Sequence, residues 1–231
     1  MIEKIRISLW DIFTFFMTGV FALIVTLSVL ALTGRLPKHD VVIDFVIKLP
    51  TTYIIVVAPI VLTLLGLLIE PMANFFERYI GKHLYFWLKL NKAERYSDEV
   101  VMKDYIKNHC FGDLNNRIEN PYHLCKDYVE TKQLSTTFMV FLARYGFYRN
   151  CSFIVLVAGI FYFVDNLDGA SFLLMLLSFL ISALLTKRAN EFYSYQGPAV
   201  YNAFLIDHLN WPAQQMAKVQ KQTEKPTENQ D

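Results

Sequence analysis

The sequence predicts an all-α, polytopic membrane protein with four transmembrane helices and a helical cytoplasmic module between helices 2 and 3. Three observations carry this prediction. Four long apolar runs contain no charged residue, although 19% of the chain is charged. Three of the runs approach the roughly 20 residues that a helix needs to cross a bilayer, and the third along the chain is shorter. Basic residues also crowd into some connecting segments and are missing from another, which is typical of a membrane protein with a fixed orientation.

The four predicted spans are separated by segments of very different length. The first, second and fourth are close to the length of a full span, and Phe138–Ala143 can lengthen the shorter third one. The runs are Ile12–Leu32, Thr51–Ile69, Asn150–Val164 and Gly169–Thr186. Lys4 and Arg6 before the first run resemble the start of a signal peptide. However, that run exceeds the roughly 7–15 apolar residues of a signal peptide, so we expect a retained first span.

The distribution of Lys and Arg predicts the orientation. The turn between the third and fourth spans, Asp165–Asp168, has no basic residue, whereas the fourth span is followed directly by Lys187-Arg188. The segment between the second and third spans is the most basic, with Arg78, Lys82, Lys89, Lys92, Arg95, Lys103, Lys107, Arg117, Lys126, Lys132, Arg144 and Arg149. Because short basic segments stay in the cytoplasm, we expect a multi-pass protein of the inner (plasma) membrane with both termini cytoplasmic. Arg35, Lys38 and Lys48 in the first outer loop oppose this orientation but are fewer.

The chain divides by composition into two hairpins, a module and a tail. The predicted parts are a first transmembrane hairpin (1–70), a cytoplasmic helical module (71–143), a second transmembrane hairpin (144–187), a cytoplasmic helical extension (188–212) and a disordered tail (213–231). Glu70-Pro71 is expected to end the second span. Beyond it, Phe75–Leu90 mixes aromatic and basic residues, which predicts an amphipathic helix that lies either on lipid or on the rest of the module.

Local signals predict three further helical boundaries. Ser97-Asp98-Glu99 is a helix start with acids in the first turn, and this helix should run to about Asn108. Asn120-Pro121 should start another, with a break near Leu134–Thr137 before the third span. After the fourth span, Gly197-Pro198 should separate a helical extension from a short helix over Ala199–Leu209.

Span one carries a stripe of small or hydroxyl side chains spaced four residues apart. Its members are Thr14, Thr18, Ala22 and Thr26. Residues at this spacing share one helix face, and small side chains let helices approach closely in lipid. Two interpretations stay open: packing within the bundle, or an interface between subunits of a homo-oligomer, with or without a pore.

Charged residues at the inner ends of the spans suggest an ion pair. Asp11 precedes span one, while Arg144 and Arg149 precede span three, so the three can meet at the inner boundary. The alternative is that these side chains extend separately to the headgroups.

No cluster predicts a metal, a cofactor or a catalytic residue. His109, Cys110, His123 and Cys125 lack the spacing of good zinc sites. The sequence therefore predicts a protein that is not an enzyme. Two Arg/His pairs nevertheless resemble the R-x₄₋₆-H pattern of HEPN ribonucleases, in which such a pair supplies acid/base and charge-stabilising groups. These are Arg78 with His83 and Arg117 with His123, the second interrupted by Asn120-Pro121.

The layout, with Ala143–Asn150 at span three and Lys187–Tyr193 after span four, resembles small four-span membrane proteins of bacterial phage-defence systems. Examples are the membrane subunit of Kiwa and the membrane accessories of type VI-B CRISPR loci. The resemblance implies a non-enzymatic component that senses a stimulus or recruits a cytosolic effector, with antiviral defence as the implied setting. The expected partners are the lipid bilayer, further copies of the chain and a cytosolic protein. The net charge of +1 argues against direct nucleic-acid binding. A channel or depolarising pore, and a membrane-tethered HEPN-like RNase, remain as alternatives.

Overall fold

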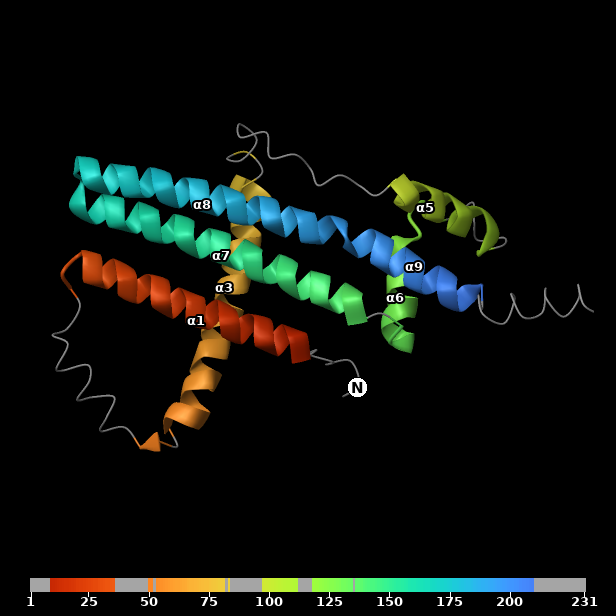
Figure 1. Ribbon diagram of the computed structural model, residues 1–231, viewed down its shortest axis with the longest axis horizontal. Coiled ribbons are helices and arrows are strands. Elements are labelled where there is room, and N and C mark those ends of the chain that lie inside the picture. Colours follow the sequence, from red (N-terminus) through yellow and green to blue (C-terminus); the bar gives the residue numbers. More distant parts are fainter. Residues whose placement is uncertain are drawn as a thin grey trace, which may run out of the picture. The chain divides into compact units, whose positions relative to one another are not determined.

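A computed structural model describes residues 9–35, 50–51, 53–81, 83, 97–111, 118–134 and 136–209 (Figure 1). Within these ranges the regular structure is entirely helical. The chain forms two compact units. One, here called the spanning unit, comprises residues 1–94 and 139–193, and the second unit comprises residues 95–138 and 194–231. The predicted tail, most of the first outer loop and the segment 84–96 lie outside the described residues, so the five-part division of the chain stays a prediction.

Four helices in the described ranges are long and apolar enough to cross a membrane: Ile12–Leu32, Tyr53–Gly81, Thr137–Asn166 and Gly169–His208. They confirm the four apolar helices predicted from the sequence. Their large apolar side chains are widely exposed, with Leu68 66% and Leu184 65% accessible. Such a surface is costly in water and stable in lipid, which supports a membrane protein with four candidate transmembrane helices.

The spanning unit contains α1 (Leu9–Leu32), α3 (Ala58–Phe76, flanked by the π-helical turns η2, Tyr53–Val57, and η3, Glu77–Gly81), α7 (Thr136–Asn166) and α8 (Gly169–Ser194). In Figure 1, α7 and α8 lie side by side and antiparallel. Helix α1 runs alongside α7, and α3 crosses these three helices. A short turn joins α7 to α8. There the Asp168 carboxylate accepts a hydrogen bond from the Ser171 N–H (2.7 Å), and the Ser171 hydroxyl accepts one from the Asp168 N–H (3.1 Å). This reciprocal cap satisfies two backbone donors at the start of α8.

Two glycines allow α1 and α3 to touch backbone to backbone. A methyl group placed on Gly19 would overlap the carbonyl oxygen of Leu62, and one placed on Gly66 would overlap the carbonyl oxygen of Phe15. Only residues without a Cβ permit this approach. It is the close contact that small residues provide between helices in lipid, where association depends on packing.

The helix does not end at Glu70-Pro71, contrary to the sequence-based expectation. Pro71 lies inside α3, which runs on to Phe76 and then into η3. Proline removes one helical hydrogen bond, but tertiary contacts can hold a helix together across it. Here those contacts reach both sides of the proline, because α7 binds Glu70 before it and Glu77 after it.

The second unit contains α5 (Ser97–His109), α6 (Tyr122–Lys132), the first residues of α7 and α9 (Gln196–His208). The helix predicted from Ser97 to about Asn108 is confirmed. The predicted break before span three is also present, because α6 ends at Gln133 in the left-handed region (φ 55°). The buried apolar side chains of this unit include Ile106, Cys125, Val129, Phe138, Val200, Tyr201 and Phe204.

The break after the fourth span lies earlier than predicted. It falls at Tyr195, so Gly197-Pro198 occupies the first turn of α9 and does not separate two helices. Proline is tolerated there because first-turn N–H groups have no partner within the helix. At the other end of α9, Asp207 accepts hydrogen bonds from Tyr128 Oη (2.6 Å) and Lys132 Nζ (2.8 Å). The bond to Asp207 raises the pKa of Lys132 to about 12.

Candidate functional site

Arg149 lies between two glutamates at the crossing of α3 and α7. Its side chain is only 10% exposed. Arg149 Nη2 lies 3.4 Å from Glu70 Oε1, and Arg149 Nε lies 4.0 Å from Glu77 Oε2. The glutamates are seven residues apart, which places them on one face of a helix. Tyr145 donates a hydrogen bond from Oη to Glu77 Oε2 (3.1 Å), and the guanidinium lies 5.0 Å from the centre of the Tyr145 ring. We call these four residues the Arg149 cluster.

The Arg149 cluster is an ionic crosslink within helices that are candidates to cross the membrane. Ionisable groups at such positions are costly unless they are paired, and they often mark functional or locking sites. The carboxylates of Glu70 and Glu77 both face the Arg149 guanidinium, so its positive charge is fully compensated. Its buried Nε still lacks a hydrogen-bond partner among the described residues. The arrangement is that of a polar lock, with α7 holding α3 on both sides of Pro71.

Hydroxyl groups join α7 to α8 further along the helices. Ser152 Oγ donates to the Ser182 carbonyl oxygen (2.8 Å), and Ser182 Oγ donates to the Ser152 carbonyl oxygen (2.9 Å). Thr186 Oγ1 lies 2.7 Å from Ser152 Oγ. Gly159 also comes so close to Ser178 that a Cβ on the glycine would overlap the serine side chain. The hydroxyls of span four therefore serve contacts with α7.

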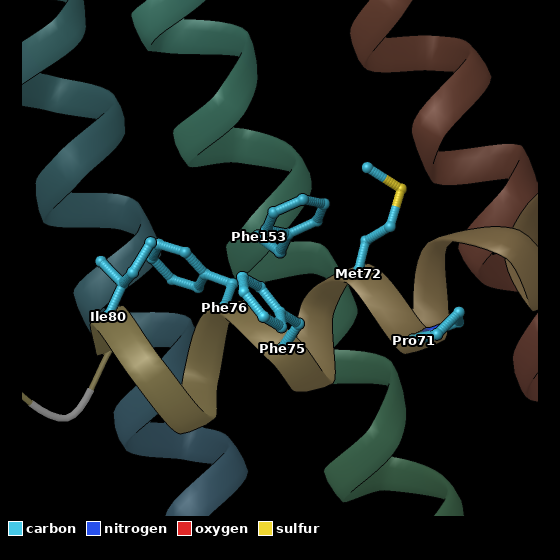
Figure 2. Close-up of a pocket in the computed structure, with 6 residues that line it drawn as sticks. All are labelled: Pro71, Met72, Phe75, Phe76, Ile80 and Phe153. Carbon is cyan, nitrogen blue, oxygen red and sulfur yellow. The ribbon is translucent and has the colours of Figure 1, made fainter.

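An open apolar groove lies beside the Arg149 cluster. Figure 2 shows its six lining residues, five from α3 and η3 and one from α7: Pro71, Met72, Phe75, Phe76, Ile80 and Phe153. Its volume is about 390 Å³. The rings of Phe76 and Phe153, 5.6 Å apart between centroids, join its two walls. With no polar side chain in the lining, the groove suits an apolar ligand.

The predicted stripe on span one is mostly buried within a single copy of the chain. Thr14, Thr18 and Ala22 are buried, whereas Thr26 is exposed. The Thr14 methyl group lies beside Gly146 of α7, and the buried Thr18 hydroxyl finds no partner among the described residues. The stripe's first three residues thus already pack inside the chain, and its role between subunits stays a prediction.

The two arginines of the predicted inner-boundary ion pair, Arg144 and Arg149, contact residues other than Asp11. Arg149 is engaged by Glu70 and Glu77, as described above. Arg144 lies 5.3 Å from the centre of the Phe192 ring. The side chain of Asp11 lies outside the described residues, so a contact with it stays a prediction.

The residues considered for metal binding serve local contacts. His109 stacks on Tyr105, with ring centroids 4.6 Å apart, and His123 meets the ring of Tyr122 edge-on. Burial raises the pKa of the Cys125 thiol to about 12, which disfavours the thiolate that binds metals. Among the described residues, no three His, Cys, Asp or Glu side chains gather as a metal site would require.

Among the described residues, no observed contact gives the first proposed ribonuclease pair a catalytic partner. Arg78 lies 5.7 Å from the centre of the Tyr79 ring, and His83 is exposed. For the second pair, Arg117 lies outside the described residues.

Sequence reasoning missed Glu70, Glu77 and Tyr145 as partners of Arg149. The available signal was the seven-residue spacing of two acids on either side of Pro71. That spacing becomes informative only if the helix continues through the proline, and the sequence-based expectation ended the span there.

Comparisons with protein-family models, curated proteins and solved structures find no match to this chain.

Proposed function

We propose that this chain is a non-enzymatic, homo-oligomeric component of the inner membrane that recruits a cytosolic effector protein through its second unit. The distribution of Lys and Arg supports a cytoplasmic location for both termini and for the second unit. The four apolar helices supply the anchor. The resemblance to phage-defence proteins suggests antiviral defence as the setting.

The observation that carries this proposal is an exposed apolar stripe on α5. Val101, Tyr105 and His109 follow one another at four-residue intervals, which places them on one helix face. Val101 is 68% exposed and Tyr105 is 40% exposed. On another face of the same helix, one position after Tyr105, Ile106 is fully buried. The helix is thus anchored by one face and presents a second apolar face outward.

An apolar stripe at this spacing suits recognition by another protein. Anchors at i and i+4 on a helix are the side chains that enter a hydrophobic groove on a partner. Aromatic residues such as Tyr105 contribute strongly to such interfaces. The stripe belongs to the second unit, whose helix α5 is far more polar than the spanning helices. A soluble effector protein with an apolar groove is therefore the partner that fits.

Val101→Asp should abolish recruitment of the effector without unfolding the chain. The substitution places a charge in the middle of the stripe, whereas the wild-type side chain makes few internal contacts at 68% exposure. We expect at least a tenfold loss of the co-purified partner and a matching loss of protection in a phage plating assay. Thr131→Asp on α6 is the matched control, since it adds the same charge at another exposed position of the second unit.

Site-specific photo-crosslinking identifies the partner to be scored. A crosslinker at Val101 should capture one protein in infected or stimulated cells, and a crosslinker at Thr131 should not. Equal protection and equal partner recovery in wild type, Val101→Asp and Thr131→Asp would refute recruitment through this stripe.

The two alternative functions have weaker structural support. A pore needs polar side chains that face a shared channel, but the hydroxyls of Ser152, Ser182 and Thr186 bond to one another between α7 and α8. A ribonuclease needs an acid or base beside Arg78, whose described contact is the Tyr79 ring.

A further inference from the structure

The apolar groove lies where the surface of α7 changes from charged to apolar. Phe153, which forms one wall, belongs to the uncharged run that begins at Asn150. Arg149 and Tyr145 come one and two helical turns earlier. A residue four positions away lies on the same face, so the groove begins just beyond the Arg149 cluster. In a membrane-spanning helix, such a change from charged to apolar side chains corresponds to the level of the lipid headgroups.

The wall formed by α3 and η3 continues as an exposed aromatic surface. Met72 is 58% exposed and Phe75 is 62% exposed. Together with Tyr79, whose ring is tilted against that of Phe75 with centroids 4.7 Å apart, they form one face of the helix after Pro71. An amphipathic segment with an aromatic face and a basic flank is typical of helices that lie at the membrane interface.

Arg78 supplies the basic flank and forms no ion pair with an acid among the described residues. It follows Pro71 by seven positions and Phe75 by three, so it lies on the edge of the same face. The ion pairs of the described residues do not include it, and its observed contact is the Tyr79 ring. The neighbouring Glu77 is turned to Tyr145 and Arg149. The Arg78 guanidinium is therefore available for an anion, three positions along the chain from Phe75 of the groove.

We propose that this groove binds one anionic phospholipid, with an acyl chain between Phe75, Phe76 and Phe153 and the phosphate at Arg78. The entirely apolar lining suits a hydrocarbon chain, and the free guanidinium suits a phosphate. The groove is formed by helices that are candidates to cross the membrane, so the ligand would reach it from the bilayer. The bound lipid would stabilise the contact between α3 and α7 next to the Arg149 cluster.

The test is lipid retention by the full-length protein. The protein is reconstituted with equal amounts of phosphatidylglycerol and phosphatidylcholine, extracted gently and analysed by native mass spectrometry. Wild type should retain phosphatidylglycerol preferentially. Arg78→Gln should lower this preference about fivefold, the effect of one basic residue near an anionic surface, about 1 kcal/mol. Phe75→Gln, which makes the groove polar at an exposed position, should reduce retention of both lipids.

Two control variants separate this site from the general lipid coat. Arg188→Gln removes another exposed arginine of the spanning unit, which pairs with Glu191. Leu68→Gln makes α3 polar outside the groove, at a side chain that is 66% exposed. Both should behave as wild type. If Leu68→Gln lowers retention as much as Phe75→Gln, or if Arg78→Gln leaves the headgroup preference unchanged, the proposed site is wrong. Displacement of the lipid by inorganic phosphate alone would also contradict it, because the acyl chain would then contribute nothing.

Discussion

Gly66→Ala should lower the free energy of unfolding by about 3 kcal/mol, at the upper end of the range for overpacked cores. The added methyl group would overlap the carbonyl oxygen of Phe15, which belongs to the backbone of α1 and cannot rotate away. The two helices must separate, and the close packing that joins them is lost along the whole crossing. Gly19→Ala should act in the same way through Leu62. The effect is measured by detergent-induced unfolding in mixed micelles.

Gly146→Ala is the matched control for this substitution. It also lies in the middle of a candidate spanning helix, but its added methyl group would meet nothing closer than the Thr14 methyl at 3.9 Å. Replacing a helical glycine without a clash gains stability, by roughly 0.5–1 kcal/mol. Opposite signs for Gly66→Ala and Gly146→Ala are therefore expected. Equal effects would show that α1 and α3 do not cross at these glycines.

Arg149→Met should destabilise the spanning unit by about 3 kcal/mol, the lower end of the range for breaking a buried ion pair. Methionine fills part of the volume but leaves Glu70 and Glu77 without their counter-charge in an apolar setting. The lower value applies because the two glutamates are 36% and 29% exposed. Thermal unfolding in detergent measures the change.

Removing the acids as well should rescue this variant. Arg149→Met combined with Glu70→Gln and Glu77→Gln carries no unpaired charge, so much of the lost stability should return. Arg144→Met is the control on the same helix, since Arg144 is exposed and lies against the Phe192 ring. A triple variant that is less stable than Arg149→Met alone would contradict the ionic crosslink.

The sequence was sufficient for the elements that depend on composition and on local signals. Long uncharged runs identified the four apolar helices, because solvation by lipid demands them wherever a helix crosses. The acids after Ser97 correctly marked the start of α5, and the break before α7 was expected near Leu134, where Gln133 has a left-handed conformation. These features are decided by a few neighbouring residues.

The elements that depend on tertiary contacts could not be predicted in this way. Pro71 is a strong local signal for a helix end, yet contacts from Arg149 and Tyr145 hold the helix on both sides of it. The stripe on span one drew attention to Thr18, whereas the closest approach to α3 is made by its neighbour Gly19. Partners far apart in the chain decided both cases, and a single sequence does not specify such pairs.

The most direct test of the whole account is the sidedness of two engineered cysteines. Asn166→Cys lies at the exposed end of α7, next to the turn before α8, and Thr131→Cys lies at an exposed position of α6. Both are made in a Cys110→Ser background, because the remaining Cys125 and Cys151 are buried. The reagent is a membrane-impermeant thiol label, added to cells whose outer envelope is permeable and whose inner membrane is intact. It should label the cysteine at position 166. It should reach the cysteine at position 131 only after the inner membrane is opened. Labelling of both positions from the same side would contradict a second unit held in the cytoplasm by four membrane-spanning helices.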